Sequence, residues 1–446
     1  MMISPDELKQ QISAALEQKS SLEWLSITEQ AKAVFADQSI PTRKTEQWKY
    51  SPLTPLLTTP YFDAKAPSAS VEREAAKACF AKVTDTHRIV FLDGKFQPAL
   101  SDCSDLENQG VLTQFSNCND DQREQINLHL GSVCQLNQHV FSAVNYQAIE
   151  DGILIQAPAN TKLEQPIHIV YLSTEQAQPQ FAQTTLLVLA ESGTQLQLIE
   201  QFDSLTDQAN NLHNHCCEMV IKPNAHVVHL RMQIEAESQC QINGLHIKLE
   251  RDSHYEQHAI NFGSQLKRND ITVNFDANNA YCRLNGVFLI KHKQHIDNHI
   301  NLEHATAHCN SDTVYKGFIT DESRAVFNGR IHIHKDAQKT EAHLNNKNLL
   351  LSNKAELDTK PELEIYADDV KCSHGASIGQ LDEKSLFYFQ SRGIDRATAE
   401  AMLCLGFVNE MVELFPNQQV QQLITERLAK FFNDVDKLKS LWSLES

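Results

Sequence analysis

Apolar residues recur along the chain with two different periods, and the changes between them divide the sequence into three parts. Near the N-terminus, Leu8, Ile12 and Leu16 are spaced as on one face of a helix. From about residue 150 to 380, apolar and polar residues alternate in runs such as GILIQA, HVVHLRMQI and GRIHIH. Alternation with period two is typical of half-buried β-strands. After about residue 382 the helical spacing returns.

Turn and helix-capping residues support this division. Asp93-Gly94 predicts a turn between two short strands in RIVFLDGKF. Gly393 is placed to end a helix, and Asp395 or Thr398 to cap the next one. We therefore predict an N-terminal helical and mixed domain over residues 1–150, a β core over 151–382, and a C-terminal helical domain over 383–446.

An internal repeat suggests how the β core is built. Asn243-Gly244, Asn285-Gly286 and Asn328-Gly329 each precede an alternating run, and they are 42 and 43 residues apart. Since Asn and Gly tolerate positive φ, we interpret each pair as a corner between strands. A fixed period favours stacked coils, with two coils of about 20 residues per period, over a sandwich of irregularly spaced hairpins. The predicted fold is mainly β, a right-handed parallel β-helix core flanked by N-terminal and C-terminal α-helical domains.

Charge and composition restrict which partners and which cellular location the protein can have. The formal net charge is −18 and no local basic patch is evident, which disfavours nucleic acid as a partner. The sequence has no secretory signal pattern and no apolar run of membrane-spanning length, so we expect a cytoplasmic protein with no membrane partner. Eleven dispersed cysteines without a Cys-x-x-Cys pair do not form a disulfide framework. Most of them are expected to be buried as small apolar residues.

Nucleotide-binding motifs and the common zinc-protease motif are absent from the sequence. There is no P-loop, no G-x-G-x-x-G and no H-E-x-x-H. Histidines are frequent between His292 and His343. In IHIH, the alternation predicts Ile331 and Ile333 pointing inward with the histidines pointing outward, so we interpret these histidines as surface residues rather than a metal cluster.

One histidine belongs to a different pattern. Cys372 and His374 continue an alternating strand, where residues i and i+2 share a face about 6.5 Å apart. A thiolate and an imidazole together suit iron, zinc or copper. A closed structural site needs four ligands, and neighbouring residues offer no others. The pair is therefore inert, completed by remote residues, or completed by another chain.

Two longer segments resemble a known family. KCSHGASIGQLDEKSLFYFQSRGIDRATAEAMLCLGF, from Lys371 to Phe407, resembles the C-terminal signature of the SufD branch of the SufB/SufD family. PTRKTEQWKYSPL, from Pro41 to Leu53, resembles the N-terminal signature of the same branch. These proteins are scaffold subunits of the SUF iron–sulfur cluster assembly machinery. The SufB branch typically carries H-E-A-[ST] where this chain has CSHGAS, so the resemblance favours the SufD branch.

The resemblance implies a function without enzymatic activity of the chain itself. It implies a non-ATPase scaffold that pairs with a SufB-like subunit through its β-helix, supports iron acquisition, and binds a SufC-like ATPase through C-terminal helices 395–446. No tightly bound cofactor is implied, only a transient iron–sulfur cluster shared with SufB. His374 would be the ligand contributed to that cluster, with Cys372 beside it. In isolation two copies of the chain can form a homodimer through the same surface.

Three other interpretations remain open on the sequence. A β-helix polysaccharide lyase or hydrolase would be secreted, which the absent signal and the cysteines oppose. A purely structural partner would have no metal role, so substituting His374 or Cys372 would leave cluster formation unchanged. The chain could also take the SufB-like role.

Overall fold

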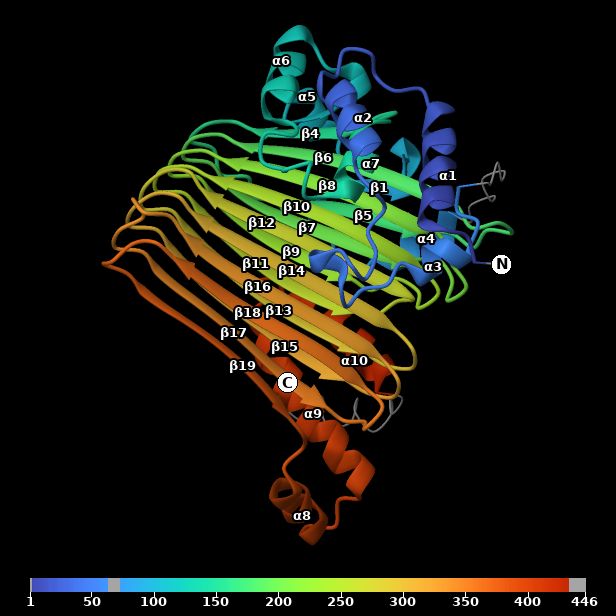
Figure 1. The fold of residues 1–446 in the computed structure, drawn as a ribbon, viewed down its shortest axis with the longest axis vertical. Helices are drawn as coiled ribbons and strands as arrows, with labels where there is room; N and C mark the ends of the chain where they lie inside the picture. The colour runs from blue at the N-terminus through green and yellow to red at the C-terminus, as the bar shows by residue number, and fades with distance from the viewer. Residues whose placement is uncertain (1, 63–72, 433–446) are drawn as a thin grey trace.

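The computed structural model describes residues 2–62 and 73–432, and two long sheets dominate it (Figure 1). The ten-stranded sheet runs in the order β19-β17-β15-β13-β11-β9-β7-β5-β1-β2. The nine-stranded sheet runs in the order β18-β16-β14-β12-β10-β8-β6-β4-β3. From β4 onward, consecutive strands alternate between the sheets, and neighbours within each sheet are parallel. The core is therefore a parallel β-solenoid, as the alternating pattern predicts.

Most strands of the solenoid are nine or ten residues long, and the first two are shorter. They are β4 Ile153–Ala157, β5 Ile167–Ser173, β6 Phe181–Ala190, β7 Gln195–Ser204, β8 Leu212–Ile221, β9 His226–Gln233, β10 Cys240–Leu249, β11 His254–Phe262, β12 Leu266–Phe275, β13 Tyr281–Ile290, β14 His295–His304, β15 Asn310–Ile319, β16 Arg324–Ile333, β17 Glu341–Leu350, β18 Glu356–Ile365 and β19 Lys371–Gly379. Shorter strands precede them, namely β1 His87–Leu92, β2 Lys95–Phe96 and β3 Leu112–Gln114.

The predicted coil length is wrong, because the coils are longer than the Asn-Gly repeat suggests. One coil separates neighbouring strands of the same sheet, and those of the nine-stranded sheet begin at Cys240, Leu266, His295, Arg324 and Glu356. The three Asn-Gly pairs lie in β10, β13 and β16, which are three strands apart. The repeat thus corresponds to one and a half coils rather than two. Successive Asn-Gly pairs therefore lie in different sheets.

The Asn-Gly pairs are also not corners. Each lies inside a strand, and none of their residues has positive φ. The glycines are there because neighbouring side chains leave no room, since a Cβ on Gly286 would lie 2.3 Å from the ring of Tyr315. Positive φ occurs instead at loop residues such as Asn224 (58°) and Asp252 (58°), where the chain turns between the sheets.

Helices cover the outer faces of the two sheets. The N-terminal part contains α1 Pro5–Glu17, α2 Ile27–Asp37, η1 Glu46–Trp48, α3 Thr54–Thr58, α4 Arg73–Phe80, η2 Pro98–Leu100, α5 Ser104–Asn108, η3 Phe115–Asn117, α6 Asp120–His129 and α7 Val140–Tyr146. Apolar residues of α1, α2 and α7 pack against outward-facing residues of the nine-stranded sheet, including Leu187 and Leu189. In the same part, β1 and β2 form the predicted hairpin, with positive φ at Asp93 and Gly94.

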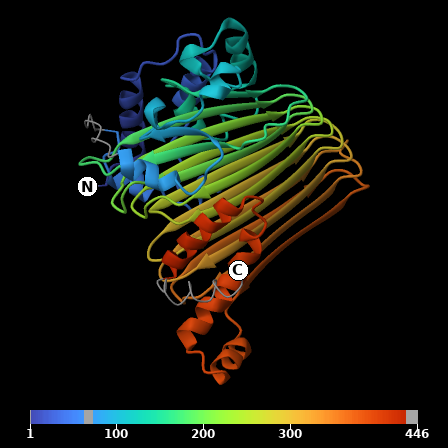
Figure 2. The same ribbon diagram turned by 180° about the vertical axis from the view of Figure 1, so that it is seen from behind.

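Of the C-terminal helices, α9 and α10 lie on the other sheet, whereas α8 extends beyond the last strands (Figure 2). They are α8 Glu383–Ser391, α9 Arg396–Val412 and α10 Gln418–Phe431. Residues of α9 and α10 such as Val408 and Ile424 pack on Leu230, Val287 and other outward residues of the ten-stranded sheet. The predicted capping is confirmed, because Gly393 follows α8 with φ of 84° and the Asp395 side chain accepts from the Thr398 amide at the start of α9.

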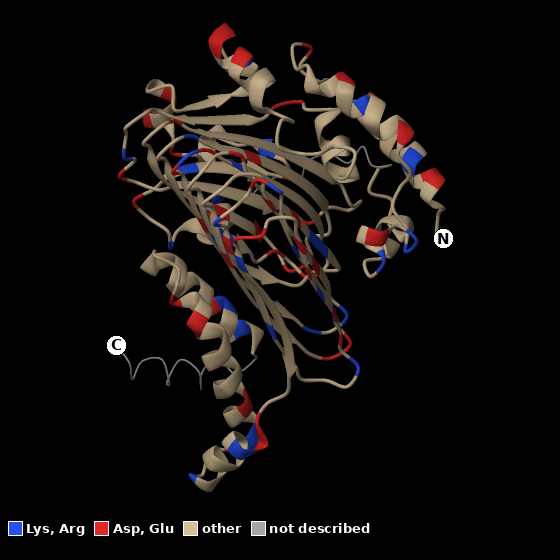
Figure 3. Cartoon of the chain, turned by 60° about the vertical axis from the view of Figure 1, so that its left-hand side comes forward, with Lys and Arg blue, Asp and Glu red and all other residues tan. Residues whose placement is uncertain are grey.

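Most cysteines are buried and none forms a disulfide, as the sequence predicts. Nine cysteines are buried, Cys79 and Cys372 are half-buried, and all eleven are free. Over the described residues, Lys and Arg are interspersed with Asp and Glu on strands and helices alike (Figure 3). Among the helices of the described ranges, none is long and apolar enough to cross a membrane.

Candidate functional site

Strand β19, which carries Cys372 and His374, forms one edge of the ten-stranded sheet. It pairs with β17, and no strand of the described residues pairs with its other side. The strand β18 is likewise the last strand of the nine-stranded sheet. The two strands belong to the final coil, so both sheets end together at this end of the solenoid (Figure 1).

The register places Cys372 and His374 on the same face, as the sequence predicts. Cys372 lies opposite Ala342, and His374 lies opposite Leu344. Ala342 and Leu344 are both part of the buried core between the sheets. Because paired residues in a parallel sheet point the same way, Cys372 and His374 continue the inward-facing columns of the solenoid.

Because no further coil of the described residues stacks on β19, the pair is only partly covered. Cys372 is half-buried against the core, whereas His374 is exposed. Burial raises the pKa of the Cys372 thiol above its ordinary value, although the backbone of Ala342 opposes the shift. On the opposite face of β19, Ser373 lies 2.7 Å from His343 Nδ1, so this serine has a partner within the chain.

The pair is also geometrically incomplete as a metal site. Among residues 2–62 and 73–432, the only group of three His, Cys, Asp or Glu ligand atoms within 4.8 Å of one another is elsewhere, at Glu303, His332 and His334. The described chain therefore offers two ligands at β19 but not a third. Of the three alternatives left by the sequence, completion by remote residues therefore finds no support among the described residues. The pair is inert or is completed by another chain.

The open edge of β19 also offers backbone donors. The Lys371 amide donates to Thr340 O, just before β17 (2.9 Å). Since amides point alternately to the two sides of a strand, those of Cys372, His374 and Ala376 point away from β17. The open side of β18 is less regular, because Pro361 lies in this strand and has no N–H.

Apolar side chains surround this end of the solenoid. Tyr366 directly follows β18 and is 63% exposed, and Ile378 of β19 is 52% exposed. In α8, Phe387 is 71% exposed and Tyr388 is 54% exposed. Exposed large apolar residues near an open sheet edge are typical of surfaces that another protein covers.

The second recognisable segment, residues 41–53, packs on the outer face of the nine-stranded sheet. It is distant from β19 in the sequence. Arg268 of β12 donates to Gln47 O (2.8 Å), and its guanidinium lies 3.9 Å from the centre of the Trp48 ring. Ser51 bonds to Asp297 and lies 3.0 Å from His295 Nε2, both on β14. The segment thus has a structural role in joining the N-terminal helices to the solenoid.

The Glu303, His332 and His334 cluster was not predicted from the sequence. His332 and His334 point outward as predicted, and the structure brings a ligand atom of each within 4.8 Å of one on Glu303. Glu303 and His332 are paired directly across β14 and β16. A correct coil length was the signal that could have brought them together, because these two residues are separated by one coil of the solenoid.

Comparison with known proteins gives the family. A model of the SufBD core domain of the SUF system for iron–sulfur cluster assembly matches residues 171–407, and a model of the SufBD N-terminal region matches residues 6–169. The chain belongs to the SufBD family. Both recognisable segments lie inside the matched regions, which together cover most of the chain.

Individual relatives support the same assignment. The iron–sulfur cluster assembly protein SufD of Escherichia coli is 31% identical over 88% of this chain and 89% of its own length. A SufBD family protein of Synechocystis is 29% identical over 86% of this chain and 85% of its own length. The chloroplastic protein ABCI7 of Arabidopsis thaliana is 28% identical over 93% of this chain and 87% of its own length. This SufBD-family chain is thus SufD-like, and it belongs to a family of assembly scaffolds.

Proposed function

We propose that this chain is a non-ATPase scaffold subunit of a SUF complex and pairs with a SufB-like subunit through the last coil of its solenoid. The observation that carries the proposal is the edge strand β19, where Cys372 and His374 face inward beside unpaired backbone donors. A second solenoid that added its edge strand here would extend the sheet and cover the exposed Ile378. Alone, two copies of the chain would use this edge to form a homodimer.

The proposed pairing would complete a metal site at Cys372 and His374. His374 and Cys372 would supply two ligands to a transient iron–sulfur cluster, and the SufB-like partner would supply the others. An imidazole ligand is neutral and binds iron without locking it in a closed four-thiolate site, which suits a cluster that must later leave. Iron acquisition is the part of assembly that a histidine-bearing subunit would support.

We propose that a SufC-like ATPase binds the C-terminal helices within 395–446, of which residues 433–446 lie outside the described part of the chain. Support comes from the attachment of α9 to the solenoid. The buried Lys316 of β15 donates to Phe407 O (2.9 Å) and pairs with Glu410 (2.5 Å), both on α9. Movement of the helices by ATP-driven closure of the ATPase would therefore be transmitted to the last coils. Solenoid contacts that stay unchanged during ATPase dimerisation would exclude this coupling.

A proline substitution tests the edge pairing. Ala376→Pro removes one of the N–H groups that point away from β17, and it leaves the amides that bond to β17 in place. We expect co-purification with the SufB-like partner to fall by about tenfold or more, while Ala376→Ser, which keeps the N–H, behaves as wild type. Melting temperature and circular dichroism of the isolated variants check the fold. Unchanged co-purification of a folded Ala376→Pro chain would exclude pairing through β19.

A further inference from the structure

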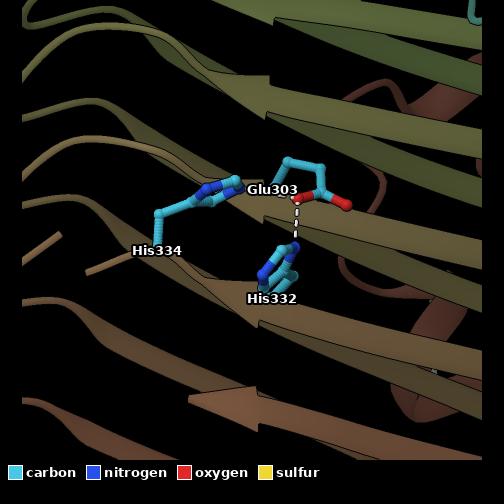
Figure 4. Close-up of side chains that lie close together, drawn as sticks. All are labelled: Glu303, His332 and His334. Atoms are coloured by element: carbon cyan, nitrogen blue, oxygen red, sulfur yellow. Dashed lines mark hydrogen bonds and ion pairs between the residues drawn. The ribbon is translucent and has the colours of Figure 1, made fainter. Parts of the chain in front are cut away.

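A second candidate metal site lies on the outer face of the nine-stranded sheet. Glu303 of β14 and His332 of β16 are directly paired across the two strands. His334 follows one residue after the end of β16. Figure 4 shows the three side chains converging above the sheet, with Glu303 between the strands and both imidazoles beside it. They belong to a different sheet from Cys372 and His374.

The three side chains meet at one carboxylate oxygen. Glu303 Oε2 lies 2.7 Å from His332 Nδ1 and 3.0 Å from His334 Nε2. The two imidazole rings stack with their centres 4.2 Å apart and their planes at 29°. One oxygen and two nitrogens are therefore within 4.8 Å of one another and face a common point.

Neighbouring residues fix this arrangement from outside the triad. Arg330 (2.5 Å) and Asn301 (3.0 Å) both donate to Glu303 Oε1, which leaves Oε2 to the histidines. Arg330 also forms a two-pronged pair with Glu364, so its positive charge is shared between two carboxylates. The His332 ring packs edge-to-face with Tyr366, at 5.4 Å between ring centres. A ligand set held by a surrounding shell is typical of metal sites.

The triad faces open space. It lines a polar cavity of about 670 Å³ that also contains Asp270, His299 and Arg330. Glu303 and His332 are only 17% and 19% exposed, whereas His334 is 45% exposed. Water can therefore reach the point where the three ligands meet, and can fill the coordination positions that the protein leaves free.

We propose that Glu303, His332 and His334 bind a divalent first-row transition cation of the Fe²⁺ or Zn²⁺ class, with water completing its coordination. Two imidazoles and one carboxylate with open positions suit these cations, whereas Mg²⁺ and Ca²⁺ prefer oxygen ligands alone. Binding requires a lone pair on the imidazole nitrogen that faces Glu303, so each bound ring would carry its proton on the other nitrogen. The proposal does not depend on the function proposed for β19.

Cobalt binding tests the site on the isolated chain. The metal-free chain would carry Cys372→Ser and His374→Ala, so that the β19 pair cannot contribute. We expect one equivalent of Co²⁺ to bind with visible ligand-field bands, and Glu303→Gln and His334→Ala to weaken binding at least about tenfold. His292→Ala is the matched control, since His292 pairs with Glu237 (2.9 Å) in a two-residue contact and should leave binding unchanged.

A second measurement separates lost ligands from lost folding. Zn²⁺ should raise the melting temperature of the Cys372→Ser, His374→Ala chain, because a ligand bound only to the native state stabilises it. Adding His334→Ala, the change at the most exposed ligand, should abolish that rise without lowering the metal-free melting temperature. Co²⁺ binding and a Zn²⁺ shift that survive both Glu303→Gln and His334→Ala, or no binding at all by the parent chain, would overturn the proposal.

Discussion

At the scale of single residues, the interior of the solenoid contains buried ionisable groups, several of which contact one another. Glu200 lies 3.0 Å from His215 Nε2, 3.0 Å from His229 Nε2 and 3.3 Å from Arg231 Nε, and all four side chains are buried. Burial lowers the pKa of both histidines, and the carboxylate of Glu200 only partly offsets it. Buried histidines kept neutral in this way make the fold sensitive to acid.

His168 offers the cleanest test of that sensitivity. Its side chain is fully buried, and burial lowers its pKa to about 3 although Gln201 hydrogen-bonds to it. Between pH 6.5 and 3 the unfolded chain binds a proton that the native chain does not, so the free energy of unfolding falls as the pH falls. His168→Gln should reduce the loss of stability between pH 7 and pH 5 by about 1 to 2 kcal/mol.

Urea unfolding at the two pH values measures this difference. The exposed His308, at a positive-φ corner, provides the control, since His308→Asn suits that backbone and changes a group solvated in both states. An equal loss of stability in wild type and His168→Gln would show that His168 does not contribute to the acid sensitivity.

Glycines inside strands give a second prediction at this scale. Gly286→Ala would place a Cβ 2.3 Å from the buried Tyr315 ring, whereas a Cβ on Gly375 meets nothing within 4 Å. We expect Gly286→Ala to lower the free energy of unfolding by about 1 to 3 kcal/mol, because overpacked cores must shift. Gly375→Ala, also within a strand, should have little effect. Equal urea midpoints for the two variants would contradict this account of the Asn-Gly repeat.

At the scale of elements, Trp48 is a central contact between the N-terminal segment 41–53 and the solenoid. Trp48 packs against Arg268 and Phe141, and Arg268 is itself bound to Asp270 and Asp297 of the sheet. Because those carboxylates keep Arg268 in place, loss of the indole should free the segment without disrupting the strands.

Hydrogen exchange tests this docking. Trp48→Ala should increase amide exchange over residues 41–53 and leave β12 and β14 protected, since local opening exposes only weakly held elements. Tyr50→Ala, at a half-buried residue of the same segment, should have a smaller effect. Loss of protection in β12 and β14 as well would show that the segment is part of the solenoid core.

Sequence patterns predicted which segments form strands better than they predicted how those strands stack in the solenoid. Alternation identified the strands and the inward isoleucines Ile331 and Ile333, both fully buried. It did not give the coil length, because the Asn-Gly repeat reports close packing inside strands rather than corners. Strand register depends on contacts between residues one coil apart, so the Glu303 and His332 pairing could not be recognised without it.

At the scale of the whole molecule, the chain is a solenoid whose outer faces are partly covered by helices at both ends of the sequence. The shared face of Cys372 and His374 was predictable from alternation alone, but their place in the final coil was not, because it depends on where stacking stops. The division at residues 150 and 382 remains a prediction. At this open end, Cys372 and His374 lie beside an unpaired strand edge, where another chain would supply the remaining ligands of the proposed site.

The most direct test of the central claim is the metal content of the assembled complex. This chain would be co-expressed anaerobically with SufB-like and SufC-like partners and purified by a tag on this chain. Iron, acid-labile sulfide and visible absorbance would then be compared between wild type, His374→Ala and His343→Ala. His343 is the control, because it lies on the next strand and contacts Ser373 on the opposite face of β19.

We expect the three proteins to co-purify in every case. The His374→Ala complex should lose about nine-tenths or more of its iron and sulfide, because a cluster with one ligand missing is bound at least about tenfold more weakly. The His343→Ala complex should match wild type. An intact His374→Ala complex with the iron and sulfide content of wild type would contradict the account, and would make the pair at β19 a bystander in a structural subunit.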